Sequence, residues 1–306
     1  MKNNQHYFKI SQQNPESHLD ESYFLLEKHP ELTNYILGVR EIKEILITIK
    51  KLRERKEKSQ IVEKYFLMLF STFNQRFANC SELGCFVNAC DTTRDLIQKD
   101  YNSFRKITVF FLEKRDVNDE VPVNWIQAIL DSNSSRRKGE LGERKLIKIL
   151  EKLKFKEVKN WTALREQKKC VARFSNEIFS SENVKKELKL AMPLKKQGKN
   201  LDLIIKFNKK IFLLEAKHSN VGGGGQNKQI SELIEILSVK KEKSNIGYIS
   251  FLDGTYSNIL LGEISNRAKR KLIQRKEIEE YLGKNTKNYW LNTAGFKALF
   301  FDLINS

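Results

Sequence analysis

The segment 201–217 constrains the fold of this chain more than any other part of the sequence. Two apolar runs, 201–207 and 210–217, flank the polar pair Asn208-Lys209. Apolar residues occupy consecutive positions in both runs, so both faces of each strand would be buried. This pattern predicts a two-stranded hairpin inside a sheet that helices cover on both sides.

The register of this hairpin decides which polar side chains meet. A two-residue turn at Asn208-Lys209 places Asp202 opposite Glu215. Strand side chains alternate between faces, so Glu215 and Lys217 share a face. A loop with an odd number of residues would shift the register and separate the two carboxylates. We therefore expect Asp202, Glu215 and Lys217 to form one polar patch at the end of the hairpin.

Two carboxylates and an ammonium in such a patch are suited to metal-assisted hydrolysis. Two close carboxylates repel each other unless a cation lies between them. Mg²⁺ is commonly held by one or two carboxylates together with substrate phosphates. The lysine can orient a water molecule, and the metal lowers the pKa of that water. The alternative is an ordinary amphipathic hairpin with its polar residues in solvent, but charges at the end of a strand buried on both faces are costly.

The flanking segments predict a mixed α/β fold. A helix is expected at 136–153, a second at 226–239 and a further strand at 246–252. A strand, helix and strand in succession predict a parallel pair. The intervening stretch 154–199 gives no clear pattern, although its aromatic residues are expected to pack in the core.

The first part of the chain is expected to be helical. Apolar residues recur at helical intervals from about 20 to 130, and no catalytic pattern occurs there. Polar residues at 131–135 indicate a loop. We therefore expect a helical region at 1–131 that serves DNA binding or dimerisation, followed by a catalytic domain at 132–306.

The hairpin resembles a known family of nucleases. Asp202, a gap of twelve residues and Glu215-Ala216-Lys217 resemble the PD-(D/E)XK nuclease superfamily, with Leu201 in place of the usual proline. The resemblance covers residues 136–253. It implies a restriction-endonuclease-like core, with a central mixed β-sheet flanked by helices. It also implies Mg²⁺, with Mn²⁺ as a substitute, bound by Asp202, Glu215 and the backbone carbonyl of Ala216.

The expected helix at 136–153 resembles the first motif of that family. Glu143 lies one turn before Leu146 on the apolar side of this helix, which points its carboxylate toward the sheet. Glu140, one turn earlier, is the alternate residue. The other interpretation is that both glutamates only favour the positive end of the helix.

Several residues near the hairpin are candidates for accessory or DNA-contacting roles. His218 and a run of four glycines follow the catalytic strand, and the run is not a Walker A motif. A flexible connector and a solvated helix face are the alternatives for these segments. The accessory candidates are Gln226, Gln229 and His218, and the candidate DNA contacts are Gly223, Gly224, Lys228, Arg267 and Arg270.

Charge favours a polyanionic partner. The 306 residues carry a formal charge of +18, and each phosphate that Lys or Arg neutralises releases counterions. Codon bias toward lysine is the alternative explanation. No apolar run is long enough to span a membrane, and the N-terminus lacks the pattern of a signal peptide. A cytoplasmic protein without membrane association is expected.

By analogy within the superfamily, this chain is most similar to a type II restriction endonuclease. The implied reaction is hydrolysis of double-stranded DNA at a short specific sequence, leaving 5′-phosphate ends. A homodimer and a cognate DNA methyltransferase are the expected partners. A repair or junction-resolving nuclease is the first alternative, and a non-catalytic DNA-binding protein is the second.

Overall fold

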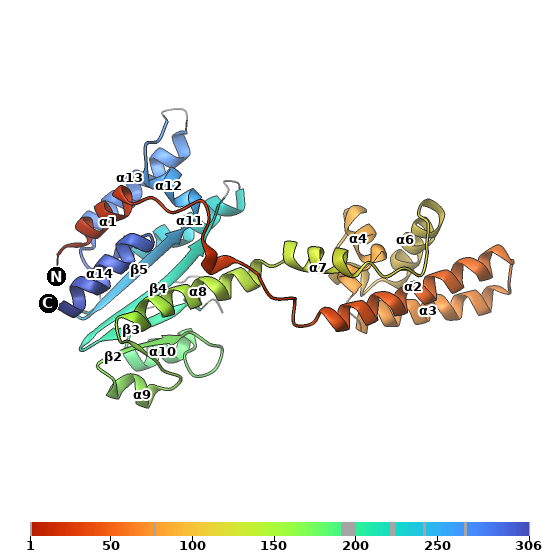
Figure 1. Ribbon diagram of the computed structural model, residues 1–306, viewed down its shortest axis with the longest axis horizontal. Helices are drawn as coiled ribbons and strands as arrows, with labels where there is room; N and C mark the ends of the chain where they lie inside the picture. Colours follow the sequence, from red (N-terminus) through yellow and green to blue (C-terminus); the bar gives the residue numbers. More distant parts are fainter. Residues whose placement is uncertain are drawn as a thin grey trace. The chain divides into compact units, whose positions relative to one another are not determined.

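A computed structural model describes residues 2–75, 78–190, 200–220, 224–240, 243–265 and 268–305. The chain divides into two compact units (Figure 1). One, the α/β unit, comprises Met1–Phe24 and Arg136–Ser306, and the other, the helical unit, comprises Leu25–Ser135. The second boundary lies close to the expected 131/132. The assignment of residues 1–24 to the helical region was wrong, because their polar and apolar contacts are with the α/β unit.

The α/β unit contains a mixed sheet of six described strands in the order β1-β2-β3-β4-β5-β6. β2, β3 and β4 are antiparallel neighbours, whereas β4, β5 and β6 run parallel, as do β1 and β2. The expected mixed α/β class and the parallel pair around a connecting helix are therefore confirmed. The strands are β1 (Lys156–Glu157), β2 (Lys169–Arg173), β3 (Leu203–Phe207), β4 (Lys210–His218), β5 (Ile246–Asp253) and β6 (Tyr289–Leu291).

The register of the β3–β4 hairpin agrees with the prediction. Phe207 pairs with Lys210, and the ladder continues to Leu203 opposite Leu214. Asn208 in the turn has a φ of 52°, a left-handed conformation that asparagine tolerates better than most residues. This even-length turn keeps every apolar side chain of the hairpin on its intended face.

Helices cover both faces of the sheet (Figure 1). On one face, helices α1 (Asn4–Gln13), α8 (Ser135–Lys152) and α14 (Thr293–Asn305) enclose a core that includes Leu146, Leu214 and Phe300. On the other face, residues of α10, α11, α12 and α13 pack against the sheet. These helices are α10 (Ser181–Leu188), α11 (Gly224–Leu237), α12 (Thr255–Leu261) and α13 (Lys269–Lys284).

The stretch 154–199, which had no clear pattern, contains β1, the helix α9 (Trp161–Glu166), β2 and α10. Residues 191–199 lie outside the described residues. The centre of β2 is fully buried, and this strand pairs along its whole length with β3. β3 is therefore the middle strand of a three-stranded antiparallel segment, and the helices that cover both faces of the sheet explain why both faces of the hairpin are apolar.

The helical unit consists of helices around its own apolar core, as expected. Ile42, Phe66, Phe73 and Phe104 are among the buried residues of this core. No helix in the described parts of the chain is long and apolar enough to cross a membrane. The helices are α2 (Leu32–Glu54), α3 (Ser59–Gln75), α4 (Glu82–Ala89), α5 (Arg94–Ile97), α6 (Tyr101–Lys114) and α7 (Val123–Ser132).

The buried hairpin predicts a test of stability. Leu214 has no exposed surface, so Leu214→Ala leaves a cavity and is expected to lower the free energy of unfolding by about 3 kcal/mol. Urea denaturation followed by tryptophan fluorescence measures this change. The control Ile273→Ala, at a residue that is 57% exposed, should alter the free energy by less than about 0.5 kcal/mol. Equal effects of the two substitutions would contradict the described packing.

Candidate active site

Asp202 lies one residue before β3 and is bound to the backbone of β4. Its N–H donates to the carbonyl oxygen of Leu214 at 2.9 Å. Its carboxylate Oδ2 accepts a hydrogen bond of 2.6 Å from the backbone N–H of Ala216. The regular ladder ends at Leu203, so the side chain of Asp202 replaces the next backbone bond. This arrangement holds one carboxylate beside the backbone of the Glu215-Ala216-Lys217 segment.

Glu215 and Lys217 share one face of β4. Glu215 is 1% exposed, and its Oε1 forms an ion pair with the ammonium of Lys217. Glu215 pairs with Ser250 of β5, whose hydroxyl donates to the carbonyl oxygen of Leu233 in α11. The two charged groups therefore lie on the face that α11 covers. The structure brings together the three residues that the sequence singled out.

Burial and a neighbouring carboxylate dominate the electrostatics of Asp202. Burial raises the pKa of Asp202 well above its usual range, and the negative charge of Glu215 raises it further. Lys217 and the Ala216 N–H oppose this rise without cancelling it. A divalent cation between the two carboxylates would remove the repulsion.

Glu143 approaches this pair from α8. Its carboxylate is 25% exposed and lies 3.4 Å from Nη1 of Arg173 on β2. Burial raises its pKa, the charge of Arg173 lowers it, and the charge of Glu215 raises it. Glu140 is exposed instead and pairs with Arg136 at 3.8 Å. Of the two glutamates, Glu143 is the one whose charge acts on Asp202.

The accessory candidates on α11 lie near the face that carries Glu215. Gln226 and Gln229 are half-buried on the first turns of this helix, whereas Lys228 is exposed. Gly224 begins the helix, and Gly223 lies outside the described residues.

The remaining DNA-contact candidates lie near the start of α13. Arg270 is exposed on the first turn of that helix, and Arg267 lies outside the described residues. Arg270 is therefore accessible to a polyanion.

His218 faces away from the three residues. Its Nδ1 lies 2.8 Å from Oδ1 of Asp253, and its ring stacks on Tyr23 at a centroid distance of 3.7 Å. Period-two alternation after Lys217 could have predicted this opposite face. Nothing in the sequence pattern indicated Tyr23 as its partner, because the two residues are far apart along the chain.

The oxygen atoms of the candidate site fit a hard divalent cation that binds few protein ligands. Asp202, Glu215 and the Ala216 carbonyl supply oxygen atoms only, which suits Mg²⁺ or Mn²⁺. Among the described residues, no group of three or more His, Cys, Asp and Glu side chains could hold a metal ion. Two carboxylates with a backbone carbonyl leave coordination positions for water and substrate, as Mg²⁺ sites that bind phosphates usually do.

Asp202 predicts how the stability of the metal-free protein depends on pH. A carboxyl whose pKa is raised by folding stabilises the fold below its unfolded pKa of about 3.9, and this contribution is lost as pH rises through the folded pKa. In EDTA, the Tm should therefore fall as pH rises, and Asp202→Asn should flatten that part of the profile. Calorimetry between about pH 4 and pH 8 measures both profiles, because this range extends from the ordinary pKa of an aspartate to the raised pKa of Asp202.

The control for this experiment is Asp116→Asn, at an exposed residue of the helical unit, which should keep the profile of the wild type. Added Mg²⁺ should raise the Tm of the wild type and have less effect on Asp202→Asn. Parallel profiles for the wild type and Asp202→Asn would show that Asp202 does not carry a raised pKa.

No family model matches this sequence, and neither the curated proteins nor the solved structures include one with detectable similarity to it.

Proposed function

We propose that this protein is a metal-dependent nuclease of the PD-(D/E)XK type, and more specifically a type II restriction endonuclease. The observation that carries the proposal is the convergence of Asp202, Glu215 and Lys217 at the end of the β3–β4 hairpin. Burying two acids at one point costs stability, and the raised pKa of Asp202 reflects that cost. A catalytic metal site is the simplest reason for a fold to keep such an arrangement.

Each residue of the site has a proposed role. Asp202 and Glu215 hold Mg²⁺, or Mn²⁺ in its place, together with the Ala216 carbonyl. When bound, the metal supplies an activated water and neutralises the charge that develops on the phosphate. Lys217, paired with Glu215, orients the attacking water through its ammonium. Glu143 bonds to a water near this centre from the side of α8.

The proposed substrate is double-stranded DNA, cut at a short specific sequence to leave 5′-phosphate ends. The net charge of +18 supports a polyanionic substrate, since each phosphate contact releases counterions. The helical unit is the proposed region for DNA binding or dimerisation. A homodimer would place one active site on each strand of a palindromic target. A cognate DNA methyltransferase is the partner that would protect the host DNA.

Cleavage of DNA by the purified protein tests the proposal. Unmethylated phage DNA incubated with Mg²⁺ should give discrete bands on a gel. Asp202→Ala and Lys217→Ala should each lower the cleavage rate by at least about a hundredfold, because each removes a group that acts on the reacting phosphate. Both variants should retain DNA binding in a gel-shift assay with Ca²⁺.

Lys284→Ala is the matched control, since Lys284 is an exposed lysine that also pairs with a glutamate, Glu280. This variant should cleave at the rate of the wild type. Smearing or nicking that depends on DNA structure would favour the repair or junction-resolving alternative. Intact DNA with both Mg²⁺ and Mn²⁺ across many substrates would contradict the nuclease proposal and favour the non-catalytic DNA-binding protein.

A further inference from the structure

Asp253 is a fully buried carboxylate at the end of β5 that three distant segments bind. Its Oδ2 accepts hydrogen bonds from the ammonium of Lys145 on α8 at 2.6 Å and from the hydroxyl of Tyr23 at 2.8 Å. Its Oδ1 lies 2.8 Å from Nδ1 of His218, the last residue of β4. A buried charge is tolerated only with such partners. Asp253 therefore joins the ends of β4 and β5 to α8 and to the N-terminal part of the chain.

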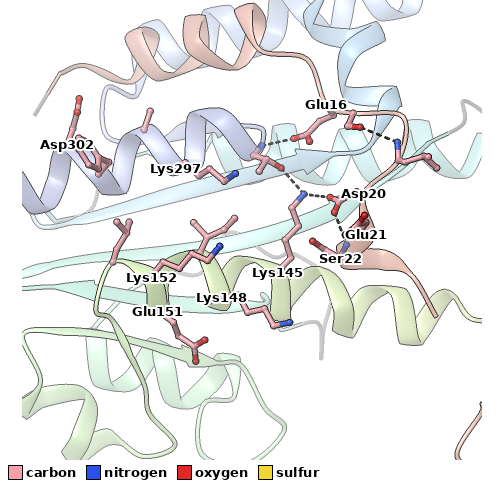
Figure 2. Close-up of a pocket in the computed structure, with 17 residues that line it drawn as sticks. Glu16, Asp20, Glu21, Ser22, Lys145, Lys148, Glu151, Lys152, Lys297 and Asp302 are labelled. Carbon is pink, nitrogen blue, oxygen red and sulfur yellow. Dashed lines mark hydrogen bonds and ion pairs between the residues drawn. The ribbon is translucent and has the colours of Figure 1, made fainter. Parts of the chain in front are cut away.

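The N-terminal partner belongs to a segment that we name the strap, residues 14–24. Glu16 of the strap exchanges two hydrogen bonds with the side chain of Asn258, and its carboxylate accepts the N–H of Thr293 at 2.6 Å. The ammonium of Lys145 points toward Asp20 of the strap (Figure 2) and donates hydrogen bonds of 2.7 Å to Oδ2 of Asp20 and to the hydroxyl of Thr293. Polar bonds thus fix the strap on α8, α12 and α14.

Tyr23 is the residue of the strap that reaches the end of the catalytic strand. Its ring stacks on the imidazole of His218 with an interplanar angle of 24°. Burial and the charge of Asp253 raise the pKa of its hydroxyl, which therefore remains a hydrogen-bond donor.

Helix α8 leaves room for this hydroxyl. A Cβ added at Gly142 would lie 2.9 Å from the hydroxyl oxygen of Tyr23, but 3.5 and 3.6 Å from the nearest ring carbons. The hydroxyl is thus the one atom of Tyr23 that a side chain at Gly142 would crowd, and the ring carbons would be in ordinary contact.

The contacts of His218 bear directly on Lys217, because the two residues are consecutive. Lys217 points to the face that carries Glu215, and His218 points to the opposite face. The ammonium of Lys217 is at the end of a long flexible chain, so its position depends on how firmly its backbone is held. His218 stacks on Tyr23 and bonds to Asp253, and these contacts hold the backbone of β4 from the sheet face opposite to Lys217.

We propose that Tyr23 is a positioning residue for Lys217, acting through its stack on His218 and its hydrogen bond to the buried carboxylate of Asp253. This inference rests on the proposed role of Lys217 in DNA cleavage. It implies that docking of the strap sets the rate of the chemical step rather than the affinity for DNA.

The first test compares Tyr23→Phe with the matched control Tyr281→Phe, at a half-buried tyrosine of α13. Tyr23→Phe keeps the ring but loses a hydrogen bond to a carboxylate, and we expect kcat to fall about tenfold with KM for DNA unchanged. Tyr281→Phe should change neither constant. A Tyr23→Phe variant with the kcat of the wild type would overturn the proposal.

The second test uses two glycines of α8 as a matched pair. Gly142→Ala crowds the Tyr23 hydroxyl, whereas a Cβ at Gly139 has no atom within 4 Å. We expect Gly142→Ala to lower kcat and Gly139→Ala to leave it unchanged. Because the hydroxyl is the crowded atom, Gly142→Ala should cause little further loss in the Tyr23→Phe background. Full additivity of the two substitutions would overturn the proposed geometry.

Hydrogen exchange measured by mass spectrometry separates this inference from the proposed function, since it needs no cleavage. In the metal-free full chain, amides of residues 216–220 should exchange about tenfold faster in Tyr23→Phe than in Tyr281→Phe. Unchanged exchange at 216–220 would overturn the positioning role even if the wild type cleaves DNA. Faster exchange in a protein that cleaves no DNA would support the role of Tyr23 in fixing this segment and overturn the nuclease proposal.

Discussion

The register of the β3–β4 hairpin is the constraint on which the site depends. A shift of the pairing by one residue would turn Glu215 and Lys217 toward α8 and α14. The apolar side chains of β4 would then also change to the opposite face of the sheet. The short turn with Asn208 at positive φ opposes this shift, and close packing of both apolar cores fixes each side chain of the hairpin in its place. The relative position of Asp202, Glu215 and Lys217 is thus set by the turn and by apolar packing along the hairpin.

The ends of β4 and β5 carry buried carboxylates on both faces of the sheet, and the two groups differ in the charges that surround them. On the α11 face, Asp202 is buried beside the negative charge of Glu215, and both effects raise the pKa of Asp202. On the α8 face, Asp253 is neutralised by Lys145 and bound by two further side chains. The protein itself supplies the countercharge of Asp253, whereas the pair of Asp202 and Glu215 is the one at which we propose a bound cation. This contrast separates a structural charge from a candidate catalytic one more clearly than burial does.

The parts of the fold with long, regular patterns could be predicted from the sequence. α8 and α11 agree with the expected segments because their apolar residues recur at a helical period, and the hairpin and β5 agree because their apolar residues form long continuous runs. β2 could not be predicted, since only three of its residues are buried and they are too few to define a period. The convergence of Asp202 and Glu215 followed from register, whereas the approach of Glu143 depended on the resemblance to a family.

The place of residues 1–24 could not be predicted for a different reason. Asn4 and Ser11 of α1 bond to backbone and side-chain atoms more than 270 residues away, and polar contacts over such separations leave no periodic signal. Tyr23 is an aromatic residue in a polar segment, and its partner Asp253 lies just after the expected strand 246–252, where no sequence pattern links the two residues.

The contact of Tyr23 with Gly142 has a consequence for the order of folding. It brings together the two points at which the chain leaves the α/β unit and returns to it. If the intervening chain were unfolded, closing this loop of roughly 110 residues would cost about 4 kcal/mol of chain entropy. Prior folding of the helical unit limits the conformations of this segment before the strap docks. Docking of the strap is therefore expected to follow folding of the helical unit, whereas the six strands, which all lie within 156–291, can pair without this closure.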